Sequence, residues 1–324
     1  MAKWLGIGEE SAYMTKGTAT VWLDFISESV RASREFIEIQ TVNERTPRFS
    51  IPGPFKSAGD IECLSNTDDL GSLLEMLLGP PDTEGTAQGT TGYKHTWNTI
   101  PNATLKSYTM EIQKEITTYE KLLYGAAIKS LTIDCPIADK VGVTASILAG
   151  KDKLETAQSP GTATTLKPLV YHQNDVSLFG SAAPWVESIS VTMENGFDED
   201  AFVQGDLFLP ELILGHFKVT GTLDLRAKDW DAYQRFLGSA SAVEPSAVVE
   251  EFEIQLQIVG EEVDTTPYYA TLDMRMPKCH FTELEIPTEQ RNRQVYTLPF
   301  EALYDDSEST VLDIELTNKR ATTM

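Results

Sequence analysis

The sequence has few basic residues for its length. Its 324 residues include 26 lysines and arginines against 49 aspartates and glutamates, which gives a formal net charge of −23 at pH 7. Proteins that grip nucleic acid neutralise phosphates with lysine and arginine. The charge balance therefore argues against a protein that binds nucleic acid through its phosphates. Solubility or adaptation to high salt would account for the surplus of acids.

Residues that bind metals or form disulfides are also scarce. The chain has three cysteines and four histidines, at Cys63, Cys135, Cys279, His95, His172, His216 and His280. None of the cysteines forms a CxxC motif, and no two histidines are spaced as HxH or HxxxH. We therefore expect no metal centre and no other cofactor, and interpret the cysteines as buried thiols in a reducing compartment.

Long hydrophobic runs are missing. No window reaches the roughly 18 consecutive apolar residues that a membrane-spanning helix needs. The first six residues, Met1-Ala2-Lys3-Trp4-Leu5-Gly6, lack the apolar core of a signal peptide. We expect that this chain does not insert into a membrane and that it starts in a cytosol.

The common catalytic motifs are absent as well. The sequence has no Walker loop, no GxGxxG after a strand, no HExxH and no GxSxG. Adjacent acids are frequent, but Asp198-Glu199-Asp200 lacks the spacing of a calcium loop and is interpreted as a solvated turn. We predict no catalytic residues and no enzyme; an acid-pair hydrolase remains an alternative, which would need two carboxylates across a cleft.

One segment of the sequence occurs twice. The first copy runs from Phe55-Lys56 to Gly79 and the second from Phe217-Lys218 to Gly238. Each copy begins with Phe-Lys, continues with a glycine and an alternating strand pattern, and then has an aspartate followed by an apolar helix that ends at Leu-Gly. The repetition indicates one supersecondary unit used twice.

Both copies contain signals for a helix. In the first, Asp68 or Asp69 is the expected N-cap, and in the second Asp229 takes that position. The apolar residues that follow recur at helical spacing, and they are Leu70, Leu73, Leu74 and Leu77 in the first copy and Trp230, Tyr233, Phe236 and Leu237 in the second. We expect each stripe to pack its helix on a sheet.

Strand patterns follow each copy in the same order. They cover residues 108–116 and 128–133 after the first copy and residues 252–259 and 281–286 after the second. Further strands are predicted at residues 20–25, 186–193, 270–276, 294–304 and 311–317. The sequence thus predicts a mainly β protein with two tandem, duplicated domains and one short helix per domain. The predicted boundaries are 1–150 for the first domain, 151–184 for a linker and 185–324 for the second domain.

Three parts of the first domain are predicted to have distinct roles. Residues 1–19 are interpreted as an arm that is frayed or docked on a neighbour. Residues 29–33 and 36–42 alternate in polarity, as half-buried strands do. The Gly-, Thr- and Pro-rich stretch between Gly79 and Ser107 is expected to be a long functional or disordered connection, and its aromatic residues favour a role in contacts.

Aromatic side chains in the arm and in the long connection are the candidate contact residues. We predict contacts between subunits through Trp4, Tyr13, Tyr93, His95 and Trp97.

The order of these elements resembles that of the major tail tube proteins of long-tailed, siphovirus-type viruses in their two-domain form. The residues that carry the resemblance are Leu5-Gly6-Ile7-Gly8-Glu9-Glu10 before Gly17-Thr18-Ala19, Gly59 to Gly79, Tyr108 to Ile112, Ile128 to Ile133, Val143 to Lys151, Phe217 to Leu223 and Thr297 to Asp305. The similarity covers nearly the whole chain, and it rests on structural patterns.

The resemblance implies a structural subunit. Each β-sandwich domain would add strands to a continuous inner barrel and keep its helix on the outside. Three chains would form a pseudo-hexameric ring, and rings would stack into a hollow helical tube. The implied partners are the protein itself, a tape measure protein, a tail terminator, baseplate or tip proteins, and double-stranded DNA that passes without specific binding. The implied locations are the tail of the virion and, during assembly, the host cytoplasm.

The surplus of acids acquires a further interpretation from this resemblance, because a like-charged conduit repels DNA instead of holding it. Two different functions stay open beside the tail tube. A two-domain β-sandwich module that binds carbohydrate or a protein ligand, on a virion or cell surface, would use exposed aromatics such as Tyr93 and Trp97. A secretion-system tube subunit is a relative of the tail tube interpretation, but such subunits typically have one domain.

Overall fold

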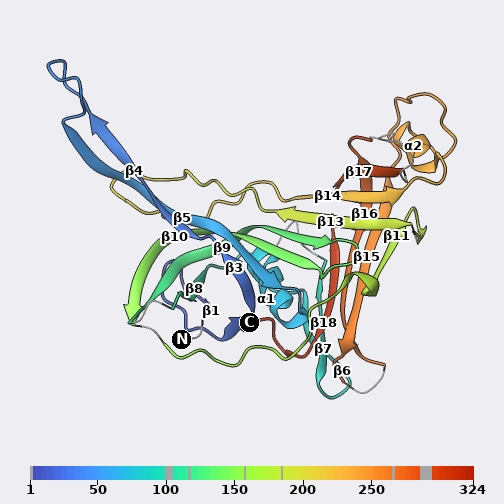
Figure 1. The fold of residues 1–324 in the computed structure, drawn as a ribbon, viewed down its shortest axis with the longest axis horizontal. Helices are drawn as coiled ribbons and strands as arrows, with labels where there is room; N and C mark the ends of the chain where they lie inside the picture. Colours follow the sequence, from blue (N-terminus) through green and yellow to red (C-terminus); the bar gives the residue numbers. More distant parts are fainter. Residues whose placement is uncertain are drawn as a thin grey trace.

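The structure is a computed structural model that describes residues 3–98, 105–115, 118–156, 158–183, 185–264, 267–284 and 294–324. Among these residues, antiparallel strands dominate and two α-helices are present (Figure 1). The predicted mainly β fold is therefore confirmed. The parts of residues 108–116 and 281–286 that lie beyond 115 and 284 fall outside the described residues.

The strands form two sets that pair in the same order, which we call repeat 1 and repeat 2. Repeat 1 contains β1 (Trp4–Glu9), β2 (Val21–Leu23), β3 (Phe25–Glu28), β4 (Arg31–Ile39), β5 (Phe49–Leu64), α1 (Thr67–Leu78), β8 (Tyr108–Gln113), β9 (Tyr119–Cys135) and β10 (Gly142–Thr156). Repeat 2 contains β11 (Asn174–Leu178), β12 (Ser181–Ala182), β13 (Val186–Glu194), β14 (Lys218–Arg226), α2 (Asp231–Phe236), β15 (Phe252–Glu262), β16 (Tyr269–Phe281) and β17 (Val295–Ala302).

The pairing order shows the duplication directly. In repeat 1, β2 pairs with β1, β1 with β8, β8 with β9, β9 with β10, β10 with β5, and β5 with β3 and β4. In repeat 2, β12 pairs with β11, β11 with β15, β15 with β16, β16 with β17, β17 with β14, and β14 with β13. The two series match strand for strand.

Two strand pairs join the repeats. β13 of repeat 2 pairs with the end of β9 of repeat 1, so that β5, β10, β9, β13, β14 and β17 form one continuous sheet, the central sheet. The hairpin of β6 (Thr83–Gln88) and β7 (Gly92–Trp97), which follows α1, pairs with β18 (Asp313–Asn318) beside β16. β10 continues past residue 150 to Thr156, and the predicted domain boundaries stay a prediction.

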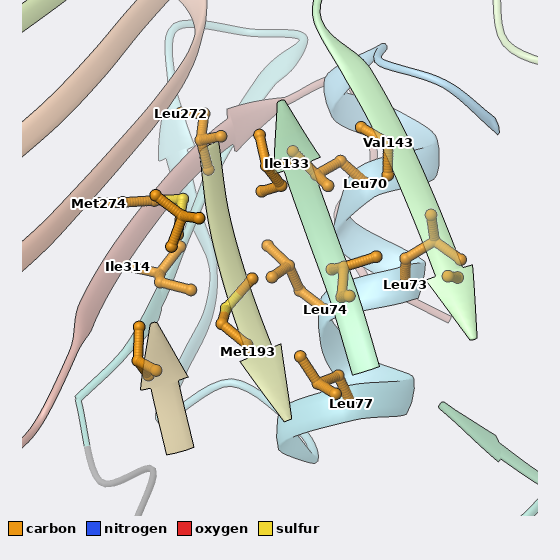
Figure 2. Close-up of a cluster of buried hydrophobic side chains, with 14 of the residues drawn as sticks. Leu70, Leu73, Leu74, Leu77, Ile133, Val143, Met193, Leu272, Met274 and Ile314 are labelled. Carbon is orange, nitrogen blue, oxygen red and sulfur yellow. The ribbon is translucent and has the colours of Figure 1, made fainter. Parts of the chain in front are cut away.

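Helix α1 is buried on all sides. Its leucines face β9, β10 and β13 at Ile133, Val143 and Met193, and residues of β16 and β18 close the same core (Figure 2). All twelve residues of α1 are buried. The implied position of the helices outside an inner barrel concerns the assembled tube and stays a prediction.

Polar contacts explain how the polar side of α1 can be buried. The C-terminal segment lies along it: Ser72 Oγ donates to the Thr323 carbonyl at 2.6 Å, and the Lys319 N–H donates to Asp68 Oδ1 at 2.8 Å. The predicted aspartate cap is wrong, because the N-cap is Asn66, whose side chain accepts the Asp69 N–H at 2.8 Å. Asp68 and Asp69 lie in the first turn, where negative charge suits the helix dipole.

We expect Asp69 to make the free energy of unfolding depend on pH. Burial raises its pKa from 3.8 to about 6, against the opposing effect of hydrogen bonds from Asn66 and from the Asp24 N–H and of the Arg320 charge. The folded-state pKa lies above the unfolded value, so this group's contribution is fully present below pH 4 and is lost as pH rises through 6. Acidification from pH 7 to 4 should therefore stabilise the wild type by about 2 kcal/mol more than D69N. Urea midpoints of both proteins across this range measure the difference, and parallel curves would contradict it.

Helix α2 does not match the predicted packing. It is a short helix that begins at Asp231 with Trp230 at the N-cap position, and Asp229 instead accepts the Asp231 N–H at 3.1 Å. Only Ala232 is buried, while Trp230 is 62% exposed. The apolar stripe therefore does not pack this helix on a sheet within the chain.

Other local predictions also need correction. Residues 4–9 of the expected N-terminal arm form β1, which pairs with β2 and β8 and is buried at all but its last residue. The expected long connection between residues 79 and 107 contains the β6–β7 hairpin. Strand β4 is exposed at all nine residues, so its alternating pattern does not reflect burial within the chain.

Candidate assembly surfaces

One face of the central sheet is open and carries hydroxyl side chains in register. On the other face, alternate residues such as Ile133, Val143 and Val191 are buried in the core. On the open face one row crosses all six strands through the paired residues Glu62, Thr144, Thr132, Thr192, Thr220 and Glu301. The Oγ1 atoms of Thr132 and Thr192 lie 2.9 Å apart at the centre of the row, where the two repeats meet.

The rows on either side of this one are polar, with three acids, one lysine and four hydroxyl residues. One contains Asp60, Ser146, Ser130, Glu194 and Lys218, and the other contains Asp134, Ser190 and Thr222. Lys140 lies 3.3 Å from Glu62, and Lys218 lies 3.2 Å from Glu301, so both carboxylates at the ends of the central row have a lysine partner. Partial burial raises the pKa of Asp134. The open face thus combines short hydroxyls with a surplus of carboxylates.

The joint between the repeats is an ordinary antiparallel ladder. Residues 189–194 of β13 pair with residues 130–135 of β9. The same strand, β13, pairs with β14 along its other edge. A strand edge of one repeat is therefore completed by the other repeat.

The corresponding edge of repeat 1 has no strand partner in the described part of the chain. There, β3 and β4 correspond to β13, and they pair with β5 alone. Side chains contact the backbone at this edge: the Val30 N–H donates to Glu28 Oε2 at 3.1 Å, and Lys121 Nζ donates to the Val30 carbonyl at 3.3 Å. Charged side chains on an open edge hinder pairing with unwanted strands. The backbone of this edge can still pair with a further strand that fits it.

Two long segments extend from corresponding ends of the central strands. Residues 195–217, the crossing segment, connect β13 with β14 and lie against repeat 1. Residues 34–55, the arm, occupy the same place between β3 and β5, but they form a two-stranded ribbon that projects from the body (Figure 1). Its exposed apolar residues are Phe36, Ile37, Ile39, Val42, Phe49 and Ile51. Several exposed apolar side chains on one element are typical of an interaction site. Sequence reasoning missed this site because it interpreted the pattern as a half-buried strand.

Three of the five predicted contact residues are buried within the chain. Trp4 packs edge-to-face on Trp22 with ring centroids 4.9 Å apart. His95 Nδ1 accepts the Gly85 N–H, and its Nε2 lies 3.0 Å from the Arg320 carbonyl oxygen. Trp97 Nε1–H donates to the Gly79 carbonyl at 2.9 Å. These three side chains are largely buried in the isolated chain, and their contacts between subunits stay a prediction.

The other two predicted contact residues are partly exposed. The Tyr13 hydroxyl donates to the Leu209 carbonyl at 3.0 Å and so ties the crossing segment to repeat 1. Burial raises the pKa of Tyr13. Tyr93 lies on β7 opposite Asn318. Because Trp97 is buried, the aromatic pair that a carbohydrate-binding module would use does not form a common surface.

The acidic cluster at residues 198–200 serves as an ion-pair anchor. Glu199 lies 3.2 Å from Lys56 Nζ and 3.0 Å from Lys129 Nζ, and these lysines lower its pKa against the effect of its partial burial. Within the described residues no group of three or more His, Cys, Asp or Glu side chains could hold a metal ion. The helices that the structure describes include none long and apolar enough to cross a membrane.

The comparisons with known proteins give one family. No curated protein matches the chain. The family model described as "Phage tail tube protein" matches residues 5–290, which is most of the chain and includes strands of both repeats. The duplicated β architecture, the polar open face and this match agree, and the chain belongs to the phage tail tube protein family.

Proposed function

We infer that three copies of this chain form a ring of six repeats, and that such rings stack into the hollow tube of a long, siphovirus-type tail through which DNA enters the host. As a member of its family, the protein is a structural subunit of a viral tail tube and is located in the tail of the virion. The observation that carries the proposal is the β9–β13 ladder, because it joins two repeats edge to edge into one sheet.

The ladder provides a template for contacts between chains. Inside the chain, β13 of repeat 2 completes β9 of repeat 1. Between chains, the β3–β4 edge would meet repeat 2 of the next copy in the same way. A contact of this kind uses two different surfaces of the chain. It closes into a ring when a whole number of subunit-to-subunit rotations adds up to 360°. The number of six repeats is carried over from the family resemblance.

The open face of the central sheet, apart from its β17 end at Glu301 and Lys218, would line the channel. Hydroxyls form weak, exchangeable hydrogen bonds, and the surplus of carboxylates repels the phosphates of passing DNA. This arrangement suits a conduit that must not hold its cargo. It also supports a role without enzymatic activity.

The remaining partners belong to the same proposal. The chain would bind copies of itself within and between rings, surround a tape measure protein before DNA passes, and meet a tail terminator and baseplate or tip proteins at the two ends. It would reside in the host cytoplasm until assembly is complete. The proposal keeps two domains at 1–150 and 185–324 with 151–184 between them, while β10 of repeat 1 and β11 and β12 of repeat 2 extend into that interval.

Mass measurement in solution tests the ring. We expect light scattering of the concentrated protein to show a particle of about 108 kDa, three times the 35.9 kDa chain, or multiples of it in stacked tubes. Particles of two, four or five chains would contradict the three-chain ring. A monomer at every concentration and salt, even with tail initiator proteins present, would contradict assembly itself.

A further inference from the structure

The arm and the crossing segment are counterparts in the two repeats. Glu194 pairs with Lys218 at the end of the β13–β14 ladder, and Ser33 pairs with Lys56 at the same point of the β4–β5 ladder. Beyond these pairs, residues 195–217 form the crossing segment and residues 34–55 form the arm. In Figure 1 both extend toward the same side of the view, away from repeat 2. The chain therefore contains one such extension in a docked state and one without a partner.

The docked extension packs on repeat 1 just beyond the joint. Phe197 and Leu209 pack there with Ala127 of β9 and Leu148 of β10, in a separate small core. At its edge Phe55 and Phe208 form a parallel bridge, and the Phe55 N–H donates to the Leu207 carbonyl at 2.8 Å. The crossing segment thus holds the two repeats together beyond the β9–β13 ladder.

Charge fixes the position of the docked extension. Glu199 lies between Lys56 of β5 and Lys129 of β9, and Lys56 also reaches Asp200 at 3.2 Å. Lys151 lies over the Phe208 ring, 5.0 Å from its centroid. An acidic segment is therefore seated on lysines of the neighbouring repeat.

The arm lacks any such support. Its residue Phe36, which corresponds to Phe197 by counting from the last paired residues, is 58% exposed, whereas Phe197 is 8% exposed. A two-stranded ribbon without a third layer is marginally stable in water. The arm therefore has the apolar side chains of a docked element, and the described part of its own chain offers it no docking surface.

The corresponding surface on repeat 2 lies at the β17 end of the open face, where Glu301 ends the central row. His280 and Glu301 pair across β16 and β17 as Ala127 and Leu148 pair across β9 and β10. Within the described structure the buried Nδ1 of His280 has no hydrogen-bond partner. Lys218, the counterpart of Lys56, is half exposed beside Glu301. A polar, partly buried site thus lies where the arm would arrive.

We propose that the arm of one copy docks on repeat 2 of the adjacent copy in the same ring, with Phe36 over the His280–Glu301 pair and Glu38 bound to Lys218. Glu38 corresponds to Glu199 and Lys218 to Lys56, so the ion pair repeats the one inside the chain. The inference rests on the proposed ring, and it assigns the arm to the contact within a ring and not to the contact between rings.

The charges outside this ion pair are also complementary. The arm and its base carry four of the chain's arginines, Arg31, Arg34, Arg45 and Arg48. The loop that follows β17 in repeat 2 carries Asp305 and Asp306, whereas its Glu308 is already paired with Arg275. Residues 34–55 also carry Glu35, Glu38 and Glu44, so the arm has no net charge, which sets it apart in a chain with a net charge of −23. Opposite charges guide and orient docking.

Cysteine cross-linking tests the proposal. The variant E38C/K218C is concentrated under conditions in which the wild type forms rings, oxidised mildly and run on a denaturing gel without reductant. The native thiols Cys63, Cys135 and Cys279 are buried and do not compete. We expect covalent products of two and three chains and none larger, because an in-ring contact closes after three steps. The control E44C/K218C uses a site about 20 Å further along the ribbon and should give little product, since a disulfide needs Cα atoms within about 7 Å.

The outcomes separate this inference from the proposed function. Rings that form without the cross-link would overturn the docking of the arm and would leave the proposed three-chain ring unaffected. Products that continue beyond three chains would show that the arm joins stacked rings, which also overturns the inference. Monomers that neither assemble nor cross-link would overturn both. As a second route, E38K and K218E should each weaken ring formation at least about tenfold, and the double variant E38K/K218E should recover most of it; additive losses would contradict the ion pair.

Discussion

Virions whose tail tube subunit carries D60K/D134K/E194K should keep tubes of normal width and lose infectivity at least about a hundredfold. The three acids lie on the open face of the central sheet, beside the hydroxyl row. Each change reverses a charge in every chain of every ring. Lysines at these positions would bind DNA phosphates and release counterions, so that the channel would hold the DNA it now repels.

The measurement is infectivity per particle, together with electron micrographs of the tails. The matched control D60N/D134N/E194N removes the same charges without reversing them and should cost much less. E244K places a lysine on an exposed loop outside the open face and should have no effect. Normal infectivity of the lysine variant in intact tails would show that this face does not line the path of the DNA.

Removal of the arm should abolish assembly and leave the subunit folded. In this variant residues 36–51 are replaced by Asn-Gly, which supports a two-residue hairpin turn. The removed residues include six exposed apolar side chains that contribute nothing to the core of the isolated chain. We therefore expect the melting temperature to change by only a few degrees.

The effect on ring formation should be large. Burial of several partly exposed apolar side chains contributes on the order of 3 kcal/mol or more to each contact. That energy corresponds to at least about a hundredfold rise in the concentration needed for rings, which sedimentation or light scattering over a dilution series measures. V243S, which removes an exposed apolar side chain from another loop, is the control. Rings at the wild-type concentration would show that the arm is dispensable for this contact.

Local patterns predicted the parts of the fold that depend on local physics. The leucines of α1 recur at helical spacing and lie in the core as expected (Figure 2). The repeated Phe-Lys and glycine positions identified β5 and β14, and Gly221 shows why glycine is needed there, since a Cβ at this position would overlap the Phe300 ring. The duplication was therefore visible in the sequence before the strand pairing confirmed it.

Contacts between distant segments could not be predicted in the same way. The periodicity of a strand says which face is apolar and does not say which strand lies beside it. The β9–β13 and β7–β18 ladders are of this kind. The burial of His95 and Trp97 follows from the second of these ladders, so no local signal distinguished them from exposed contact residues.

The arm shows a different limit of sequence reasoning. Phe36, Ile37 and Ile39 have the composition of a packed strand, yet they are exposed in the single chain. Selection acts on the assembled state, and a pattern that anticipates burial need not be satisfied within one subunit. Polar residues of α1 show the opposite, since a pattern that predicts exposure belongs to buried residues. The C-terminal segment covers them and forms hydrogen bonds to them that helical periodicity does not reveal.

End-on electron microscopy of the purified protein tests the central claim most directly. We predict rings or tubes with an open channel whose averaged views show six similar lobes that alternate between two kinds, with threefold symmetry. A particle with a closed centre, or a ring of six whole chains with all lobes identical, would contradict a channel built from three copies of a duplicated chain.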